Sequence, residues 1–302
     1  MYPSVIHDYH RPGSIQEALA AIAGGEEAAF IAGGQSLMQA LKARLVQPRA
    51  LVDLQDVAEL KGVRINGGVQ VGAMARYVEL ARESRLAPAY AALIDAATHV
   101  GDRQVRNRGT IGGSVCWNYI AACMPVVALT LDATMNLASS GGGERSVPAS
   151  EFIGAPLETT RRDAELLVSL QLPASPANAG SAYRKWALVS DGLPVIGACV
   201  YVETDASGTC TKARVGFGGL ATGPKRSPAA EARLVGCAAG ADDGIAEAMA
   251  AAAAELETQG DFWADPGYRS HLIRTLGAAV AATALRRASG RPETNPARGG
   301  LS

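Results

Sequence analysis

Hydrophobic and polar positions follow two different periods along this 302-residue chain, which predicts a mixture of helices and strands. Helical spacing runs over residues 14–24, where Ser14 is a suitable N-cap and Glu17 stands three positions later, as in a capping box. A short apolar run, a glycine turn and a second helical pattern follow over residues 28–45. We expect a strand, a glycine loop and a short helix there.

The middle of the chain continues the mixed pattern. Alternating positions on either side of Asn66 and Gly67 predict a β-hairpin. The further predicted elements are a strand at 51–54, the hairpin over 63–73, helices at 76–85 and 88–100, a glycine-rich turn with a buried strand over 102–115, and a proline-started helix at 124–132.

The last third reads as a separate, smaller α+β unit. Residues 139–144 are typical of a hairpin tip or loop, and the stretch 165–172 ends at a proline-rich connector, so we place a domain boundary near 177. Beyond it, strands precede alanine-rich helices. The predicted elements are strands at about 195–204 and 211–218, helices at 243–258 and 267–288, and a mobile tail over 289–302.

Composition and charge exclude several classes of function. Hydrophobic residues make up 48% of the chain and charged residues 19%, as in a globular protein with a substantial core. A formal net charge of −1 gives no basic field for nucleic acid. Because the sequence has neither an apolar run of about 20 residues nor a signal-peptide pattern, we expect a cytoplasmic protein.

Cysteine and histidine spacing argues against a metal centre in this chain. The five cysteines form no CxxC pair, and the four histidines lack the spacing of metal ligands. An odd number of scattered cysteines also argues against a disulfide framework. If the chain carries out redox chemistry, its cofactor must be organic.

Two glycine-rich segments are candidates for binding phosphate. The first is Ala32-Gly33-Gly34-Gln35-Ser36, between a strand and a helical pattern, where successive N–H groups would form an anion cradle. A tight strand-to-helix turn is the simpler interpretation of such a short motif. The second segment runs over 106–114 and adds hydroxyl groups to a glycine pair.

Two such cradles about seventy-five residues apart favour a dinucleotide whose pyrophosphate is held from both sides. Neither segment fits the GxxxxGK(S/T) pattern, which disfavours ATP or GTP hydrolysis. A third segment, residues 216–221, satisfies the loose GxGxxA pattern of a Rossmann turn. The sequence TGPKRSP follows it and cannot open a helix at the required place, so we reject an NAD site there.

Three motifs in order resemble one protein family: AGGQSLM at 32–38, QVRNRGTIGGS at 104–114 and AYRKWALVSDG at 182–192. They look like the FAD-binding medium subunits of molybdenum hydroxylases, the carbon monoxide dehydrogenase, xanthine dehydrogenase and aldehyde or N-heterocycle oxidoreductase type. The similarity covers roughly residues 2–288.

The resemblance implies an α+β fold of the vanillyl-alcohol oxidase and p-cresol methylhydroxylase type. Two subdomains, split near residue 57 within a domain of residues 1–177, would hold FAD, and a smaller α+β domain would follow at 178–288. Ala32, Gly33, Gly34, Gln35 and Ser36 would bind the pyrophosphate. The other implied FAD contacts are Thr110, Ile111, Gly112, Gly113, Ser114, Leu167 and Lys185, with Lys185 as a cation near the flavin.

The chain also departs from the family pattern. Tyr119 and Cys123 stand where the family carries two aspartates near the cofactor, and Gly192 replaces a third aspartate. A phenol still donates or accepts hydrogen bonds, whereas a thiol does so weakly. Trp117 and Tyr119 are candidates to flank the flavin ring, while burial as small hydrophobes is the simpler role for Cys116 and Cys123.

The resemblance implies an electron-transfer role. A large subunit would carry the molybdenum cofactor and a small subunit the [2Fe-2S] clusters, and FAD in this chain would pass electrons to NAD, oxygen, a quinone or a carrier protein. A heterotrimer is expected. Two alternatives stay open at this point: a stand-alone flavin oxidase or dehydrogenase of a small molecule, and an assembly subunit that has lost FAD.

Overall fold

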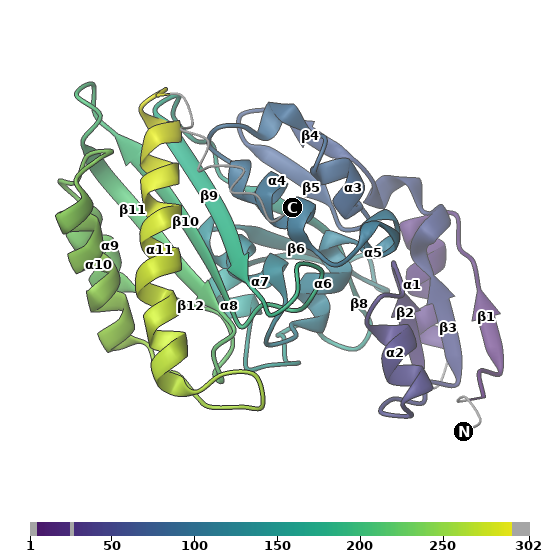
Figure 1. The fold of residues 1–302 in the computed structure, drawn as a ribbon. Helices are drawn as coiled ribbons and strands as arrows, with labels where there is room; N and C mark the ends of the chain where they lie inside the picture. The colour runs from purple at the N-terminus through teal and green to yellow at the C-terminus, as the bar shows by residue number, and fades with distance from the viewer. Residues whose placement is uncertain (1–4, 25–26, 292–302) are drawn as a thin grey trace.

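Three sheets follow one another along the chain in the computed structural model, which describes residues 5–24 and 27–291 (Figure 1). Each sheet is built from strands that are consecutive in sequence. Helices pack between and against the sheets, so that the central sheet lies between the N-terminal and C-terminal ones (Figure 1).

The N-terminal unit is a three-stranded parallel sheet in the order β1-β3-β2. Parallel neighbours need crossover connections, which the two helices supply. The Ser14 hydroxyl accepts from the Glu17 N–H, and the Glu17 carboxylate accepts from the Gly13 N–H, which fixes the start of the first helix as the sequence predicts. The elements are β1 (Asp8–His10), α1 (Ile15–Gly24), β2 (Ala28–Ile31), α2 (Leu37–Lys42) and β3 (Ala50–Asp53).

The central unit is a five-stranded antiparallel sheet in the order β4-β5-β8-β6-β7. Two hairpins build most of it, and the first turns at Asn66 and Gly67, where Gly67 has a φ of +63°. Its strands are β4 (Val63–Ile65), β5 (Val69–Gly72), β6 (Thr134–Ser139), β7 (Glu144–Pro148) and β8 (Glu165–Leu172). Its helices are α3 (Tyr77–Leu80), α4 (Ala91–His99), α5 (Arg103–Arg108), α6 (Ile111–Trp117), α7 (Cys123–Thr130) and α8 (Ala149–Phe152), with 3-10 turns at Leu54–Asp56, Ala58–Leu60 and Ser84–Leu86.

The C-terminal unit is a four-stranded antiparallel sheet in the order β12-β11-β10-β9. Helix α11 covers one face, whereas α4 and α7 of the central unit cover the other, so strand β10 is buried along nearly its whole length. The elements are β9 (Ala179–Trp186), β10 (Ile196–Thr204), β11 (Cys210–Gly218), β12 (Lys225–Arg226), α9 (Pro228–Leu234), α10 (Asp242–Glu255) and α11 (Pro266–Ala288).

An ion pair joins the central unit to the last helix. Asp95 on α4 accepts two hydrogen bonds from Arg287 on α11, at 2.6 and 3.1 Å, and a third from the Tyr183 N–H at 3.0 Å. Arg287 also donates to the carbonyl oxygen of Ser181 on β9, so one guanidinium ties a helix and a strand to α4. Because both side chains are less than a fifth exposed, this pair is shielded from water.

Most elements of the sequence prediction are confirmed. The first helix, the strand, glycine loop and short helix, the hairpin at Asn66-Gly67, and the two strands and two long helices of the C-terminal unit all form near the expected residues. The boundary near 177 falls between β8 and β9 and stays a prediction. Of the predicted tail, residues 292–302 lie outside the described part of the chain.

Two predicted elements are wrong. The helix expected over 76–85 is only α3 followed by a 3-10 turn, since Glu83 accepts from the Arg85 N–H and starts a new turn. The buried strand expected within 102–115 is a pair of helices, α5 and α6. Asp102 caps α5 and Thr110 caps α6 through side-chain oxygens, and these caps offset part of the low helix propensity of the glycines, which also pack closely against Ala73. Strands β1, β9 and β12 and helices α8 and α9 were not predicted.

No helix in the described part of the chain combines the length and apolar character needed to cross a bilayer.

Replacing Asp95 with alanine is expected to destabilise the fold by about 2 to 3 kcal/mol, because it leaves the Arg287 guanidinium and the Tyr183 N–H without this acceptor. The free energy of urea unfolding measures the effect. The control is Asp56→Ala, which removes an ion pair with Arg11 whose side chains are half exposed and is expected to cost less than about 1 kcal/mol. Equal losses in the two variants would contradict the structural role of Asp95.

Candidate functional site

A cavity of about 860 Å³ lies where the N-terminal and central units meet, and both glycine-rich segments line it. That volume is in the range of sites for small molecules and cofactors. The cavity runs from residues of α1 and β2 past the two glycine segments to the start of β8. Its lining includes Ile22, Phe30, Ala32, Gly33, Gly34, Gln35, Ser36, Gly109, Thr110, Gly112, Gly113, Ser114, Cys116, Trp117, Tyr119, Arg161, Glu165 and Leu167.

The two glycine segments touch each other through their backbones at Gly33. A Cβ placed on Gly33 would stand 2.7 Å from the carbonyl carbon of Arg108 and 2.8 Å from the Cα of Gly109, and closer still to the Arg108 carbonyl oxygen. Any side chain at position 33 would therefore push the two segments apart. The cavity depends on a residue without a Cβ at this point.

The first segment has backbone N–H groups to offer a ligand. Among the described residues, no hydrogen bond uses the N–H of Gly33, Gly34, Gln35 or Ser36. Gly34 has a φ of +73°, a conformation that glycine adopts without strain and that turns the chain sharply after β2. Successive unpaired N–H groups at such a turn favour an anion.

In the second segment, most backbone N–H groups already donate hydrogen bonds to other groups of the protein. The N–H of Ile111 donates to the Ala75 carbonyl oxygen and that of Gly112 to the Ala73 carbonyl oxygen, while the Gly113 N–H donates to the Thr110 hydroxyl. A Cβ on Gly112 would stand 2.6 Å from the Cβ of Ala73. These glycines bring α6 close to the loop after β5. The Thr110 hydroxyl accepts from the Gly113 N–H and keeps its own proton to donate to a ligand.

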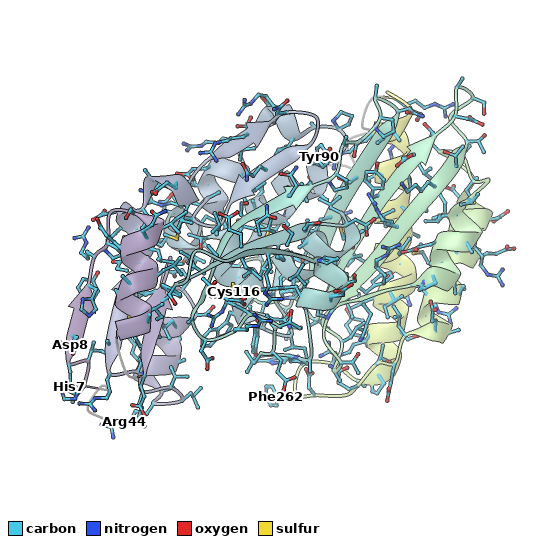
Figure 2. The ribbon with its side chains drawn as sticks, turned by 180° about the vertical axis from the view of Figure 1, so that it is seen from behind. His7, Asp8, Arg44, Tyr90, Cys116 and Phe262 are labelled. Carbon is cyan, nitrogen blue, oxygen red and sulfur yellow. The ribbon has the colours of Figure 1, made fainter. Side chains whose placement is uncertain are left out.

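The cavity lining includes aromatic side chains at the C-terminus of α6. Cys116 and Trp117 are the last two residues of α6 and Tyr119 follows them, and all three line the cavity together with Leu167. Figure 2 shows Cys116 near the middle of the molecule, well away from Phe262 at the loop before α11. Burial raises the pKa of the Cys116 thiol to about 11, which keeps it protonated at neutral pH.

An ion pair between Arg145 and Glu165 stabilises the part of the cavity lining at the start of β8. Glu165 is 4% exposed and accepts from Arg145 at 2.7 and 2.8 Å and from the Arg162 N–H at 2.8 Å. These contacts, above all the hydrogen bonds from Arg145, lower the pKa of Glu165 to about 2. The carboxylate is therefore ionised and already paired at neutral pH, which leaves it little capacity for acid–base work.

Eleven of the fourteen predicted site residues line this cavity, and three do not. Ile111 is 1% exposed in the core of the central unit, and Cys123 is 5% exposed beside Tyr183. The Lys185 Nζ donates to the Gly192 carbonyl oxygen and is not among the residues that line the cavity, and its role as a cation near the flavin stays a prediction. Burial lowers the pKa of Lys185.

The sequence analysis missed Arg161, the only lysine or arginine among the described residues that line the cavity. Nothing in its local pattern distinguishes it from the adjacent Arg162, which is exposed. The described residues contain no cluster of histidine, cysteine, aspartate and glutamate able to hold a metal ion. An organic ligand with an anionic group fits the unpaired N–H groups of the first glycine segment and the aromatic side chains of the lining.

Two family models match the chain. Residues 4–175 match the FAD binding domain in molybdopterin dehydrogenase, and residues 170–284 match the CO dehydrogenase flavoprotein C-terminal domain. The 6-hydroxypseudooxynicotine dehydrogenase complex subunit alpha of Paenarthrobacter nicotinovorans is 34% identical over 283 residues, which cover 93% of this chain and 95% of that protein. The carbon monoxide dehydrogenase medium chain of Hydrogenophaga pseudoflava is 31% identical over 281 residues, 91% of this chain and 97% of that protein.

Solved structures agree with these matches. Quinoline 2-oxidoreductase from Pseudomonas putida 86 superposes with a TM-score of 0.88 at 31% identity, covering 96% of this chain and 100% of the other. A carbon monoxide dehydrogenase structure from Hydrogenophaga pseudoflava gives a TM-score of 0.85, also at 31% identity, covering 96% of this chain and 99% of the other. The resemblance drawn from the sequence is confirmed, and so is the α+β class of the fold.

Replacing Gly33 with alanine is expected to destabilise the chain by at least about 2 kcal/mol, because the added methyl group meets the backbone of Arg108 and Gly109 rather than a movable side chain. Thermal and urea unfolding measure the loss. Gly141→Ala is the matched control, since a Cβ there has open space within 4 Å. A Gly33→Ala protein as stable as the control would disprove the close contact.

The pH dependence of stability tests whether the ion pair of Glu165 stabilises the fold. Its pKa is depressed from 4.5 to about 2, so its stabilising contribution is present above its unfolded pKa and is lost as pH falls through the folded value. We expect Glu165→Gln to lower stability at pH 7 by about 3 kcal/mol and to flatten the loss of stability between about pH 5 and pH 2. Urea unfolding across this range measures both effects. If the variant lost stability with falling pH as the wild type does, the lowered pKa of Glu165 would be refuted.

Proposed function

This chain belongs to the family of FAD-binding subunits of molybdenum hydroxylases, and we propose that it receives electrons from [2Fe-2S] clusters of a partner subunit and passes them to an external acceptor. The observation that carries the proposal is the row of unpaired N–H groups at Gly33, Gly34, Gln35 and Ser36, facing a cavity of cofactor size. FAD supplies two-electron and one-electron chemistry when bound, which suits a carrier between clusters and an acceptor.

The residues of this chain would hold the cofactor rather than react with it. The N–H groups of the first glycine segment would bind the pyrophosphate, and the hydroxyls of Thr110 and Ser114 would face it from the second. Trp117 and Tyr119 would bound the flavin end and keep bulk water from one side. Leu167 would line that end from β8.

Partner subunits complete the proposed function. Relatives are described as a medium chain and as a subunit of a dehydrogenase complex, which supports a place for this chain in a similar assembly. We propose a large subunit with a molybdenum cofactor that carries out the hydroxylation and a small subunit with the clusters. The acceptor would be NAD, oxygen, a quinone or a carrier protein.

Purification of the chain with its native partners tests this function. We expect one FAD per chain, identified after acid release, together with iron–sulfur absorption and molybdenum in the same complex. The visible spectrum and metal analysis provide the measurement, because a bound flavin and the clusters each contribute characteristic absorption.

The other outcomes separate the alternatives. A chain that binds FAD but never co-purifies with iron or molybdenum would support a stand-alone flavin oxidase or dehydrogenase. A complex with iron and molybdenum but without flavin would identify an assembly subunit that has lost FAD. Either result would contradict the proposed electron-transfer role.

A further inference from the structure

A second cavity, of about 240 Å³, adjoins the cofactor cavity. Segments far apart in the sequence line it: residues 119–121 after α6, the loop between β9 and β10, Gly219 after β11, and the loop before α11 with Arg269. Tyr119 belongs to the lining of both cavities. A molecule in the second cavity would therefore lie next to a ligand of the first.

The buried side chain of Arg269 on α11 holds these segments together. Its guanidinium donates to the Gly219 carbonyl oxygen at 2.8 Å, to the Val195 carbonyl oxygen and to the Asp261 carboxylate. The Gly219 N–H in turn donates to the Ile120 carbonyl oxygen at 3.1 Å. These bonds fix the shape of the second cavity before any ligand arrives, as is usual for small-molecule sites.

The charges in this lining cancel. Among the described residues that form it, Arg269 is the only lysine or arginine and Asp261 the only acidic residue, and the two form an ion pair. The pyrophosphate of NAD would find no unpaired cation there. The volume is also below the roughly 300 to 1,000 Å³ of most sites for drug-sized ligands. The second cavity therefore fits a neutral molecule with about one ring.

The lining is apolar and offers hydrogen-bond donors. Leu188, Val189 and Leu193 contribute to it and are each more than half exposed. The Tyr119 hydroxyl and the Trp263 indole N–H form no hydrogen bond with any described residue. The carboxylate and amide oxygens of the lining, by contrast, already accept hydrogen bonds from the protein. The best match is a ligand whose polar groups accept hydrogen bonds.

We propose that the second cavity binds a quinone, which is the acceptor that oxidises the reduced cofactor. A quinone is a neutral, apolar ring with two carbonyl oxygens that accept hydrogen bonds, so it suits this lining in size, charge and polarity. It would gain two electrons and two protons and leave as the hydroquinone, while reduced FAD loses the same two electrons and two protons. This inference rests on the proposed function and selects one of its acceptor classes.

Reoxidation of the flavin in the purified complex tests the proposal. The complex is reduced with a stoichiometric amount of dithionite and mixed, without oxygen, with a water-soluble short-chain benzoquinone in a stopped-flow instrument. We expect the rate to saturate as the quinone concentration rises, because the acceptor reacts from a site that becomes filled. NAD in the same experiment should reoxidise the flavin more slowly than the quinone does.

Two variants locate the quinone site. Leu193→Glu should raise the quinone concentration that gives half the maximal rate about tenfold, because it places a charge beside the apolar ring. Trp263→Phe removes the indole N–H and should raise that concentration roughly twofold to tenfold. Val235→Glu is the matched control, because Val235 is a half-exposed apolar residue of the same unit that lines neither cavity. It should leave the quinone dependence unchanged.

Three results would overturn the proposal. If the rate rises linearly with quinone concentration, or if neither Leu193→Glu nor Trp263→Phe changes it, the quinone reacts without this cavity. If NAD reoxidises the flavin faster, the acceptor belongs to another class. If Leu193→Glu separates the chain from its partner subunits, the exposed apolar side chains form a subunit interface instead. A wild-type complex without FAD would refute the proposed function as well, whereas bound FAD without a saturable quinone reaction would refute only this inference.

Discussion

The close backbone contact between Gly33 and the Arg108–Gly109 peptide is the constraint on which the site depends. It brings a turn of the N-terminal parallel sheet against the segment between α5 and α6, with no side chain between them. Residues of both segments line the cavity next to that contact. A protein interior is densely packed, so even one methyl group at this point would have to move two backbone segments.

The two glycine segments have different physical tasks, although their sequences look alike. In the first segment the N–H groups form no hydrogen bond with any described residue and the chain turns sharply at Gly34, so this segment can bind an anion. In the second segment, N–H groups donate to Ala73, Ala75 and Thr110. Its glycines allow close backbone packing and do not offer N–H groups to a ligand. In a family of FAD-binding subunits, this division suggests that one segment binds the pyrophosphate while the other sets the distance between the walls.

Local sequence patterns predict much of the fold and the two glycine segments of the site. Ser14 and Glu17 place a helix start correctly, and Asn66-Gly67 places a hairpin, because these signals act within a few residues. The helix at Thr110 and its glycines was not predicted, although its cap between the Thr110 hydroxyl and the Gly113 N–H is local, because the close packing of Gly112 against Ala73 depends on a distant segment. The same limit applies to Arg161, because its place in the cavity lining depends on how the loop before β8 packs, and the local sequence does not encode that packing.

A structure of the purified complex with FAD bound tests the central claim most directly. The account predicts that the pyrophosphate lies within hydrogen-bond distance of the N–H groups of Gly33, Gly34, Gln35 or Ser36, with the flavin ring at the end lined by Trp117 and Tyr119. A cofactor bound elsewhere on the chain, or one whose pyrophosphate makes no contact with this segment, would contradict it.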